Sequence, residues 1–207
     1  MNSASKAARE RWKRSEFVGE MQANMAALLA KGVNGGDFRG ISIGLEGPVE
    51  ALWFVNLHQA RISNADMSYA KLGCSLNETV LENVLFLDTE FDDCLFRKAR
   101  VVRCGFARAW MVVSLDDSVF DQCDFSEAVF TGAKLLIERG GRRVNFLGCN
   151  FTRAAFRGVE FRASRFTDCV FTDAHFSKCD FRGVKAEGGS LPSKSQFEGM
   201  EPPAWAV

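Results

Sequence analysis

The sequence lacks net charge and any long hydrophobic run. Its 26 Lys and Arg residues balance 26 Asp and Glu residues, so no overall field would draw the chain to nucleic acid or to an anionic membrane. The basic residues near the N-terminus precede no unbroken apolar run of the length that a signal peptide or a membrane span requires. We therefore expect a cytoplasmic protein with no membrane span, and we do not expect direct nucleic-acid binding.

Histidine is also scarce, which leaves few groups for catalysis. His58 and His175 are the 2 histidines, and neither has an evident nucleophile or metal ligand beside it. Carboxylates form clusters, but in a chain with 26 acids such clusters are usually solvated surfaces, and no glycine-rich phosphate loop is present. We predict that the protein is not an enzyme and needs no cofactor.

The sequence has 7 cysteines, and no two of them have Cys-x-x-Cys spacing. In a chain without a signal peptide, this pattern favours reduced thiols over a disulfide framework or a zinc site.

The sequence does contain a period of five residues. Large apolar residues, which we call centres, recur every five positions in four runs, and the residue two before each centre is nearly always small. Neither a helix, with its period of 3.6, nor a strand, with its period of 2, produces this spacing. A step of four residues joins the first run to the second, another step of four joins the second run to the third, and the fourth run follows an insertion. The centres are Leu52, Leu57, Ile62, Met67 and Leu72; Leu76, Leu81, Phe86, Phe91, Phe96, Val101, Phe106 and Met111; Leu115, Phe120, Phe125, Phe130 and Leu135; and Phe146, Phe151, Phe156, Phe161, Phe166, Phe171, Phe176 and Phe181.

Stretches such as CDFSEAVFTGA at 123–133 and CNFTRAAFRG at 149–158 resemble the pentapeptide-repeat family. The resemblance covers roughly residues 50–183. It implies an all-β solenoid, a right-handed quadrilateral β-helix with four pentapeptides to a coil. The centre and the small residue two before it would point inward, and His58 and His175 would point outward.

Every cysteine lies two residues before a centre, which identifies the cysteines as core residues. With four steps to a coil, Cys104, Cys123, Cys149 and Cys169 would form one column, one residue per coil. A metal or redox ladder is the alternative, but parallel buried side chains lack tetrahedral geometry, and Cys is a common small buried residue.

Three regions follow from the limits of the repeat. Residues 1–35 form an N-terminal cap, with a helix over 3–31 that Gly32 ends and that covers the first coil; an amphipathic helix for a membrane or a partner is the alternative. Residues 36–190 form the β-helix, with a loop insertion near 136–145 marked by Gly140 and Gly141. Residues 191–207 form an irregular tail, which either folds over the last coil or contacts a second chain, so a homodimer could form through an end of the rod.

The candidate interaction residues are charged. Arg139, Arg142 and Arg143 would give the loop a cationic tip, and the acidic clusters consist of Glu90, Asp92, Asp93, Asp116 and Asp117.

One branch of the family protects DNA gyrase by presenting an acidic, DNA-like rod. Here acids outnumber bases over 76–135 and bases outnumber acids over 136–185, so the rod is a dipole without a continuous negative stripe.

The sequence therefore favours a non-catalytic scaffold that binds another protein through the β-helix surface. The alternatives are a resistance or immunity protein that protects DNA gyrase or another type II topoisomerase, nucleic-acid binding through the basic half, and sequestration of a toxin or small molecule.

Overall fold

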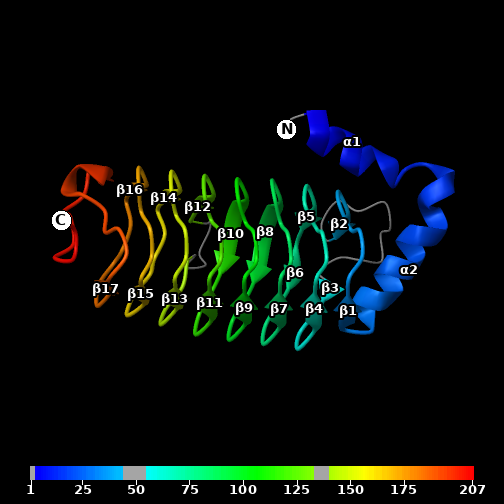
Figure 1. Ribbon diagram of the computed structural model, residues 1–207, viewed down its shortest axis with the longest axis horizontal. Helices are drawn as coiled ribbons and strands as arrows, with labels where there is room; N and C mark the ends of the chain where they lie inside the picture. The colour runs from blue at the N-terminus through cyan, green and yellow to red at the C-terminus, as the bar shows by residue number, and fades with distance from the viewer. Residues whose placement is uncertain (1–2, 44–54, 133–139) are drawn as a thin grey trace.

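The computed structural model describes residues 3–43, 55–132 and 140–207. The chain forms a parallel β-solenoid, and the right-handed quadrilateral β-helix implied by the resemblance is confirmed. Successive coils stack along a straight rod, with helices at the N-terminal end and a short irregular segment at the C-terminal end (Figure 1).

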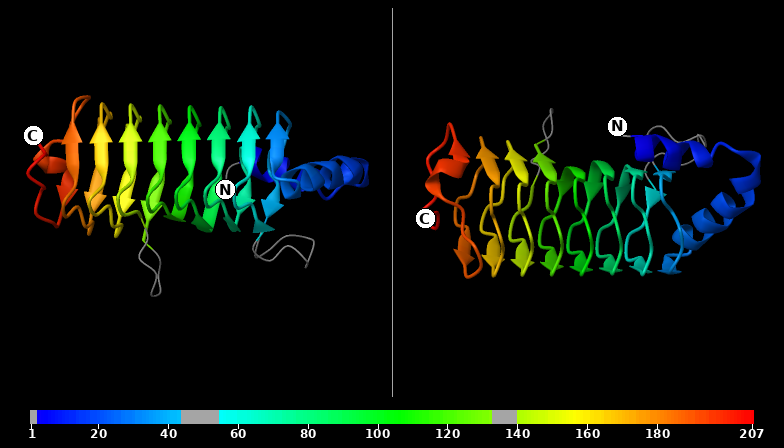
Figure 2. Two further views of the ribbon diagram at one scale, coloured as in Figure 1. Left: turned by 90° about the horizontal axis from the view of Figure 1, so that it is seen from below. Right: turned by 45° about the horizontal axis from the view of Figure 1, so that its top comes forward.

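Two parallel sheets form opposite sides of the rod, as the two views in Figure 2 show. The first sheet has eight strands, in the order β1 (Gly32–Asn34), β4 (Arg61–Ser63), β7 (Val80–Glu82), β9 (Arg100–Val102), β11 (Val119–Asp121), β13 (Asn145–Leu147), β15 (Arg165–Thr167) and β17 (Lys185–Glu187). The second sheet has ten strands. Eight of them follow the order β18 (Phe197–Glu198), β16 (His175–Ser177), β14 (Ala155–Arg157), β12 (Val129–Thr131), β10 (Trp110–Ser114), β8 (Glu90–Leu95), β5 (Lys71–Leu72) and β2 (Ser42–Ile43), and β3 (Val55–Asn56) and β6 (Cys74–Ser75) lie beside this path. On a third side the coils are joined by single β-bridges such as Leu85 to Gly105. On the fourth side they are joined by β3, β6 and the ends of β8 and β10 in the N-terminal half, and by single β-bridges such as Gly140 to Glu160 in the C-terminal half.

Turns recur with the same period of five as the centres. The residue two positions after most centres has a left-handed backbone conformation, as at Gln59, Asn64 and Tyr69, whose φ angles are 62°, 53° and 63°. On two sides the turn also closes with a hydrogen bond from the third residue after the centre, as from the Ala109 amide to the Phe106 carbonyl at 3.0 Å. Each five-residue step therefore makes one side of the coil and then turns to the next.

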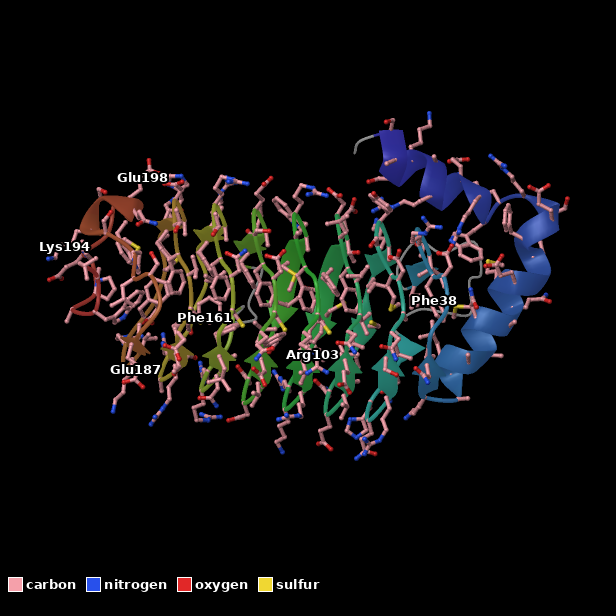
Figure 3. The ribbon with its side chains drawn as sticks, in the orientation of Figure 1. Phe38, Arg103, Phe161, Glu187, Lys194 and Glu198 are labelled. Carbon is pink, nitrogen blue, oxygen red and sulfur yellow. The ribbon has the colours of Figure 1, made fainter. Side chains whose placement is uncertain are left out.

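The centres form stacked columns of buried side chains inside the rod. Phe125 lies between Phe106 and Phe151, with ring centroids 4.8 and 5.1 Å away and nearly parallel planes. Figure 3 shows Phe38 and Phe161 in the interior, where both rings are almost fully buried. Each ring packs mainly on rings of adjacent coils, which is the nearest-neighbour packing of a solenoid.

The two steps of four residues occur where a left-handed turn residue is missing. Neither Leu72 to Leu76 nor Met111 to Leu115 contains a residue with positive φ. In β8, which has a normal five-residue step, Asp93 keeps its φ of 60°, and the pairing of β8 with β10 therefore shifts by one residue after Val112. Each step of four residues therefore lacks the left-handed turn residue that other coils have at the same corner.

The solenoid begins one coil before the predicted series. Val33, Phe38 and Ile43 are buried and spaced by five residues, and Val33 pairs with Ile62. Leu52, predicted as the first centre, lies outside the described residues. The sequence analysis began the β-helix at residue 36 but assigned no centre before Leu52, because this coil is longer than the regular ones and its period of five is interrupted after Ile43.

The predicted loop over 136–145 was placed too far along the chain. Gly140 bridges both Ser114 and Glu160, so Gly141 occupies the position of a centre between those of the two neighbouring coils. Residues 140–145 are thus part of a regular coil, and the additional residues fall between Phe130 and Gly141. The sequence analysis misplaced them because Gly141 has no side chain to continue the series; Leu135, assigned as a centre, lies outside the described residues.

The N-terminal helix is broken into α1 (Ser3–Arg11), the 3-10 turn η1 (Ser15–Phe17) and α2 (Val18–Leu29), which corrects the single helix predicted over 3–31. The chain turns after Trp12, whose buried ring donates from Nε1 to the Arg39 carbonyl at 2.8 Å. Leu28 of α2 is fully buried in the core. The helix α2 therefore covers the first coil, and α1 folds back along the rod (Figure 1).

The C-terminal segment, predicted as an irregular tail, adds the 3-10 turn η3 (Lys194–Gln196) and strand β18. Phe197 stacks on Phe176 with a centroid distance of 4.6 Å, and Trp205 packs against Phe181 at 5.6 Å. These two rings cover the C-terminal end of the hydrophobic core.

Candidate interaction surface

The predicted acidic residues Glu90, Asp92 and Asp93 lie together on β8, on the outer face of the second sheet. Glu90 and Asp92 flank the buried centre Phe91 and point outward. The Nη2 of Arg9 in α1 reaches the Oε1 of Glu90 at 3.0 Å and fixes that carboxylate beside the helix. This part of the acidic prediction therefore identifies one continuous stretch of surface.

Trp110 of β10 lies directly beside these carboxylates, and the sequence analysis missed it. Its side chain is 44% exposed, and it is in register with Glu90 on one side and Val129 on the other. Because Trp110 precedes the centre Met111, its position in the repeat already directs it outward. A large aromatic residue at an outward position was the signal available in the sequence.

Apolar side chains continue from Trp110 toward the C-terminal end of the sheet. Val112 is in register with Asp92, and Val129 is in register with Ala155; all three apolar residues are partly buried. We call this area the Trp110 surface, and it consists of Glu90, Asp92, Trp110, Val112, Val129 and Ala155. It combines an exposed aromatic ring, an aliphatic floor and acidic groups on one side.

Asp116 and Asp117 do not belong to this surface, because they lie at a different turn, where they pair with arginines. Arg143 binds Asp117 through two contacts, Nε to Oδ1 at 2.6 Å and Nη2 to Oδ2 at 2.8 Å, and this pairing lowers the pKa of the Asp117 carboxyl. The Arg142 amide donates to Asp116 Oδ1 at 2.9 Å. The two predicted sites, the cationic tip and this acidic cluster, are therefore one ion-paired group, and Arg139 lies outside the described residues.

Ion pairs of this kind join successive coils elsewhere on the rod. Arg108 binds Asp88 with Nη2 to Oδ2 at 2.8 Å, and Arg153 binds Glu127 at 2.5 Å. Arg103 also pairs with Glu82. In these columns a basic side chain on one coil pairs with an acidic side chain on the next, so the paired carboxylates do not form a continuous acidic stripe.

The cysteines are core residues, as the register predicts. All but Cys179 are buried, and burial raises the pKa of the Cys104 thiol to about 12 and that of Cys179 to about 11. Within residues 3–43, 55–132 and 140–207, no group of three or more His, Cys, Asp or Glu side chains could hold a metal ion. These thiols fill space in the core.

Family models match the regular part of the solenoid. A model described as pentapeptide repeats in nine copies matches residues 142–185, and a second, in eight copies, matches residues 113–136. This chain is a pentapeptide-repeat protein. Proteins of this family are generally structural or binding scaffolds. No curated protein matches this pentapeptide-repeat chain.

Solved pentapeptide-repeat structures are similar to the chain at low identity. The protein Rfr23 from the cyanobacterium Cyanothece 51142 is 12% identical, with 81% of this chain and 95% of that chain covered and a TM-score of 0.30. QnrB1, a plasmid-mediated fluoroquinolone resistance protein, is 16% identical, with 75% and 92% covered and a TM-score of 0.40. HetL from Nostoc sp. strain PCC 7120, involved in heterocyst differentiation regulation, is 11% identical, with 88% and 97% covered and a TM-score of 0.24.

The described helices of this pentapeptide-repeat protein include none with the length and apolar character needed to cross a membrane.

Proposed function

We propose that this pentapeptide-repeat protein is a non-catalytic scaffold that binds another protein through the Trp110 surface. The observation that carries the proposal is the exposed Trp110 ring in the middle of a rigid sheet. Tryptophan is enriched among the residues that contribute most to protein–protein binding, because its large ring is buried at low entropic cost. A ring that is 44% exposed has apolar area still available for a partner.

The surroundings of the ring indicate the chemistry of the partner. Val112 and Val129 supply an aliphatic floor, and Asp92 supplies negative charge at one edge, next to the Glu90 carboxylate that Arg9 binds. A complementary surface would place an apolar side chain against Trp110 and a Lys or Arg side chain against Asp92. We therefore propose a partner with a mixed apolar and basic surface.

The test is affinity capture with immobilised full-length protein, comparing the wild type with Trp110→Ala. The matched control is Leu85→Ala, since Leu85 is 50% exposed but lies on another side of the rod. A partner retained by the wild type and by Leu85→Ala but lost from Trp110→Ala supports the proposal, and titration with the purified partner then measures the loss. A partner that Trp110→Ala retains with unchanged affinity contradicts it.

Protection of a type II topoisomerase, with antibiotic resistance as the outcome, is a narrower version of this proposal. The observation that favours it is the group Glu90, Asp92 and Asp93, whose carboxylates would meet the basic DNA-binding surface of such an enzyme. Gyrase supercoiling with and without a fluoroquinolone, at increasing molar excess of the protein, tests this role. An unchanged assay excludes topoisomerase protection and leaves the broader proposal to the capture experiment.

A further inference from the structure

Helix α1 is a basic helix that lies along one corner of the rod, where the third side meets the second sheet. It carries Lys6, Arg9 and Arg11 against a single acid, Glu10, and Ser5 is its one buried residue. Figure 1 shows the helix running back along the rod from the N-terminal end. A helix that buries so little apolar surface is held in place mainly by its polar contacts.

Two arginines of α1 make these contacts, one on each side of the corner. On the second sheet, Arg9 donates from Nη2 to Glu90 Oε1 at 3.0 Å and from Nε to the Tyr69 carbonyl at 2.8 Å. On the third side, Arg11 binds Asp37 through two contacts, Nη1 to Oδ2 at 2.7 Å and Nη2 to Oδ1 at 2.8 Å. Charge-assisted bonds of this kind add geometric specificity to the attraction.

Between the two arginines the backbone of α1 lies directly on Gly40. A Cβ at Gly40 would lie 2.3 Å from the Ala8 carbonyl carbon, so the helix can approach this closely only over glycine. At 3.6 residues per turn, Arg9 and Arg11 lie on opposite flanks of Ala8, about 100° and 60° around the helix axis. The corner therefore fits a helix with a small residue followed by arginines one and three positions later. We call it the α1 site, and it consists of Asp37, Gly40, Tyr69 and Glu90.

Helix α1 can leave this site without leaving a buried charge unpaired. Asp37 keeps a second partner, because Arg39 Nη2 lies 2.7 Å from its Oδ2, and the Glu90 side chain is already 41% exposed. The helix has 9 residues, and isolated helices shorter than about 12 residues are marginal in water, so α1 depends on the site for its structure. Trp12, which is bonded to the Arg39 carbonyl, anchors the chain beyond it.

A protein bound to the Trp110 surface would reach the α1 site. Pairing of β2, β5, β8 and β10 places Ser42, Lys71, Glu90 and Trp110 in register on consecutive coils. Coils are about 4.8 Å apart, so the coil of Gly40 is about 14 Å from that of Trp110. A standard interface covers about 800 Å² on each partner, which is a patch about 30 Å across. A patch centred on Trp110 therefore overlaps α1.

We propose that the α1 site is a docking site for a basic helix of the protein partner, and that α1 occupies it until the partner displaces it. This proposal rests on the proposed function, because the α1 site and the Trp110 surface share Glu90. The partner helix would carry a small residue over Gly40 and Lys or Arg one and three positions later, as Ala8, Arg9 and Arg11 do here. Because α1 is part of the same chain, its effective concentration is of millimolar order, and it lowers the affinity of the partner without abolishing binding.

Fluorescence anisotropy of a labelled peptide with the sequence of residues 1–14 tests the site. The full-length variant Arg9→Glu/Arg11→Glu vacates the site, because each new carboxylate would face Glu90 or Asp37. The peptide should bind this variant at least about tenfold more tightly than the wild type, whose own α1 competes. A peptide with both arginines replaced by glutamate is the control and should bind neither protein. Equal affinity for variant and wild type, or no binding up to several hundred micromolar protein, would overturn the proposal.

Glycine substitutions test whether the peptide occupies the same corner. Gly40 and Gly35 both have positive φ, 74° and 85°, but a Cβ at Gly35 would meet nothing within 4 Å. Added to the vacated variant, Gly40→Ala should weaken peptide binding at least about tenfold, and the matched control Gly35→Ala should leave it unchanged. In the wild-type background, Gly40→Ala should speed hydrogen exchange of the α1 amides and Gly35→Ala should not, a measurement that does not need the vacated variant. Equal effects of the two alanines in either assay would contradict docking on Gly40.

Trp110→Ala distinguishes a failure of this proposal from a failure of the proposed function. Added to the vacated variant, it should leave peptide affinity unchanged, since α1 is seated while Trp110 stays 44% exposed. A peptide that needs Trp110 would be bound elsewhere on the sheet, which overturns the α1 site. A partner recovered by affinity capture should bind the vacated variant about tenfold more tightly than the wild type, and equal affinities would contradict displacement of α1. Capture that fails while the peptide binds contradicts the Trp110 surface and supports the α1 site as an independent docking site.

Discussion

Replacing Phe125 with alanine should remove one ring from the middle of the stack and destabilise the protein strongly. The ring is fully buried, and it is stacked on Phe106 and Phe151 in the two adjacent coils. Burial of this kind predicts a loss of about 3–5 kcal/mol in the free energy of unfolding. Each stacked aromatic contact accounts for about 0.5–1.5 kcal/mol of it.

Two variants separate the contributions to this loss. Phe125→Leu keeps most of the volume but removes the stacking, and it should cost less than about 2 kcal/mol. Phe181→Ala removes a ring near the end of the rod that has one near-parallel neighbour, Phe161, at 6.3 Å. It should cost at least about 1 kcal/mol less than Phe125→Ala, because fewer stacked contacts disappear.

Urea unfolding followed by both tryptophan fluorescence and far-UV circular dichroism measures these losses. Coincident curves would justify a two-state free energy for each variant. Equal losses for Phe125→Ala and Phe181→Ala would refute the nearest-neighbour description, since that description makes the cost depend on the number of adjacent coils.

Three other substitutions test local features of the coil. Ala163→Gly should stabilise the protein by about 0.5–1 kcal/mol, because Ala163 is exposed with φ of 56° and glycine adopts a positive φ at lower steric cost. The control Ala155→Gly in strand β14 should destabilise the protein by a similar amount. Thermal unfolding measures both changes. Gly141→Ala should cost about 1–3 kcal/mol, because a Cβ there would lie 2.3 Å from Val144, and a neutral result in the same urea assay would contradict the assignment of Gly141 as a tightly packed centre. The lowered pKa of Asp117 means that its pair with Arg143 stabilises the fold above the unfolded pKa of about 4 and that this contribution is lost as the pH falls through the folded pKa. The melting temperature of the wild type should therefore drop more between about pH 7 and pH 3 than that of Asp117→Asn, and equal drops would show that the pair contributes nothing.

The solenoid could be predicted from the sequence because its core demands the same kind of side chain at every fifth position. Phe120, Phe125 and Phe130 identify the period without any knowledge of the coil they belong to. The same logic fails where a coil departs from the rule. Gly141 occupies a centre without a side chain, and Val33 begins a coil in which the five-residue period of large apolar residues breaks off after Ile43.

The ion pairs could not be predicted because they depend on the register of whole coils. Asp117 faces Arg143 only when the inserted residues precede Gly141. The sequence analysis placed the insertion over 136–145, so it assigned Arg143 to a loop and not to the coil. Trp110 was missed for a different reason. The period shows that its side chain points outward, but only the pairing of β8 and β10 shows that it lies beside Glu90.

The alternating charges also bear on how a chain with nearly identical coils finds its correct threading. A Phe column offers the same surface at every level, so stacking that skipped one coil would still bury ring on ring. Such a mistake would bring Asp88 next to Glu127 and Arg108 next to Arg153, whereas correct stacking places each carboxylate against a guanidinium. The surface charges thus distinguish between arrangements that the core treats as equivalent, and they favour assembly of the coils in sequence order.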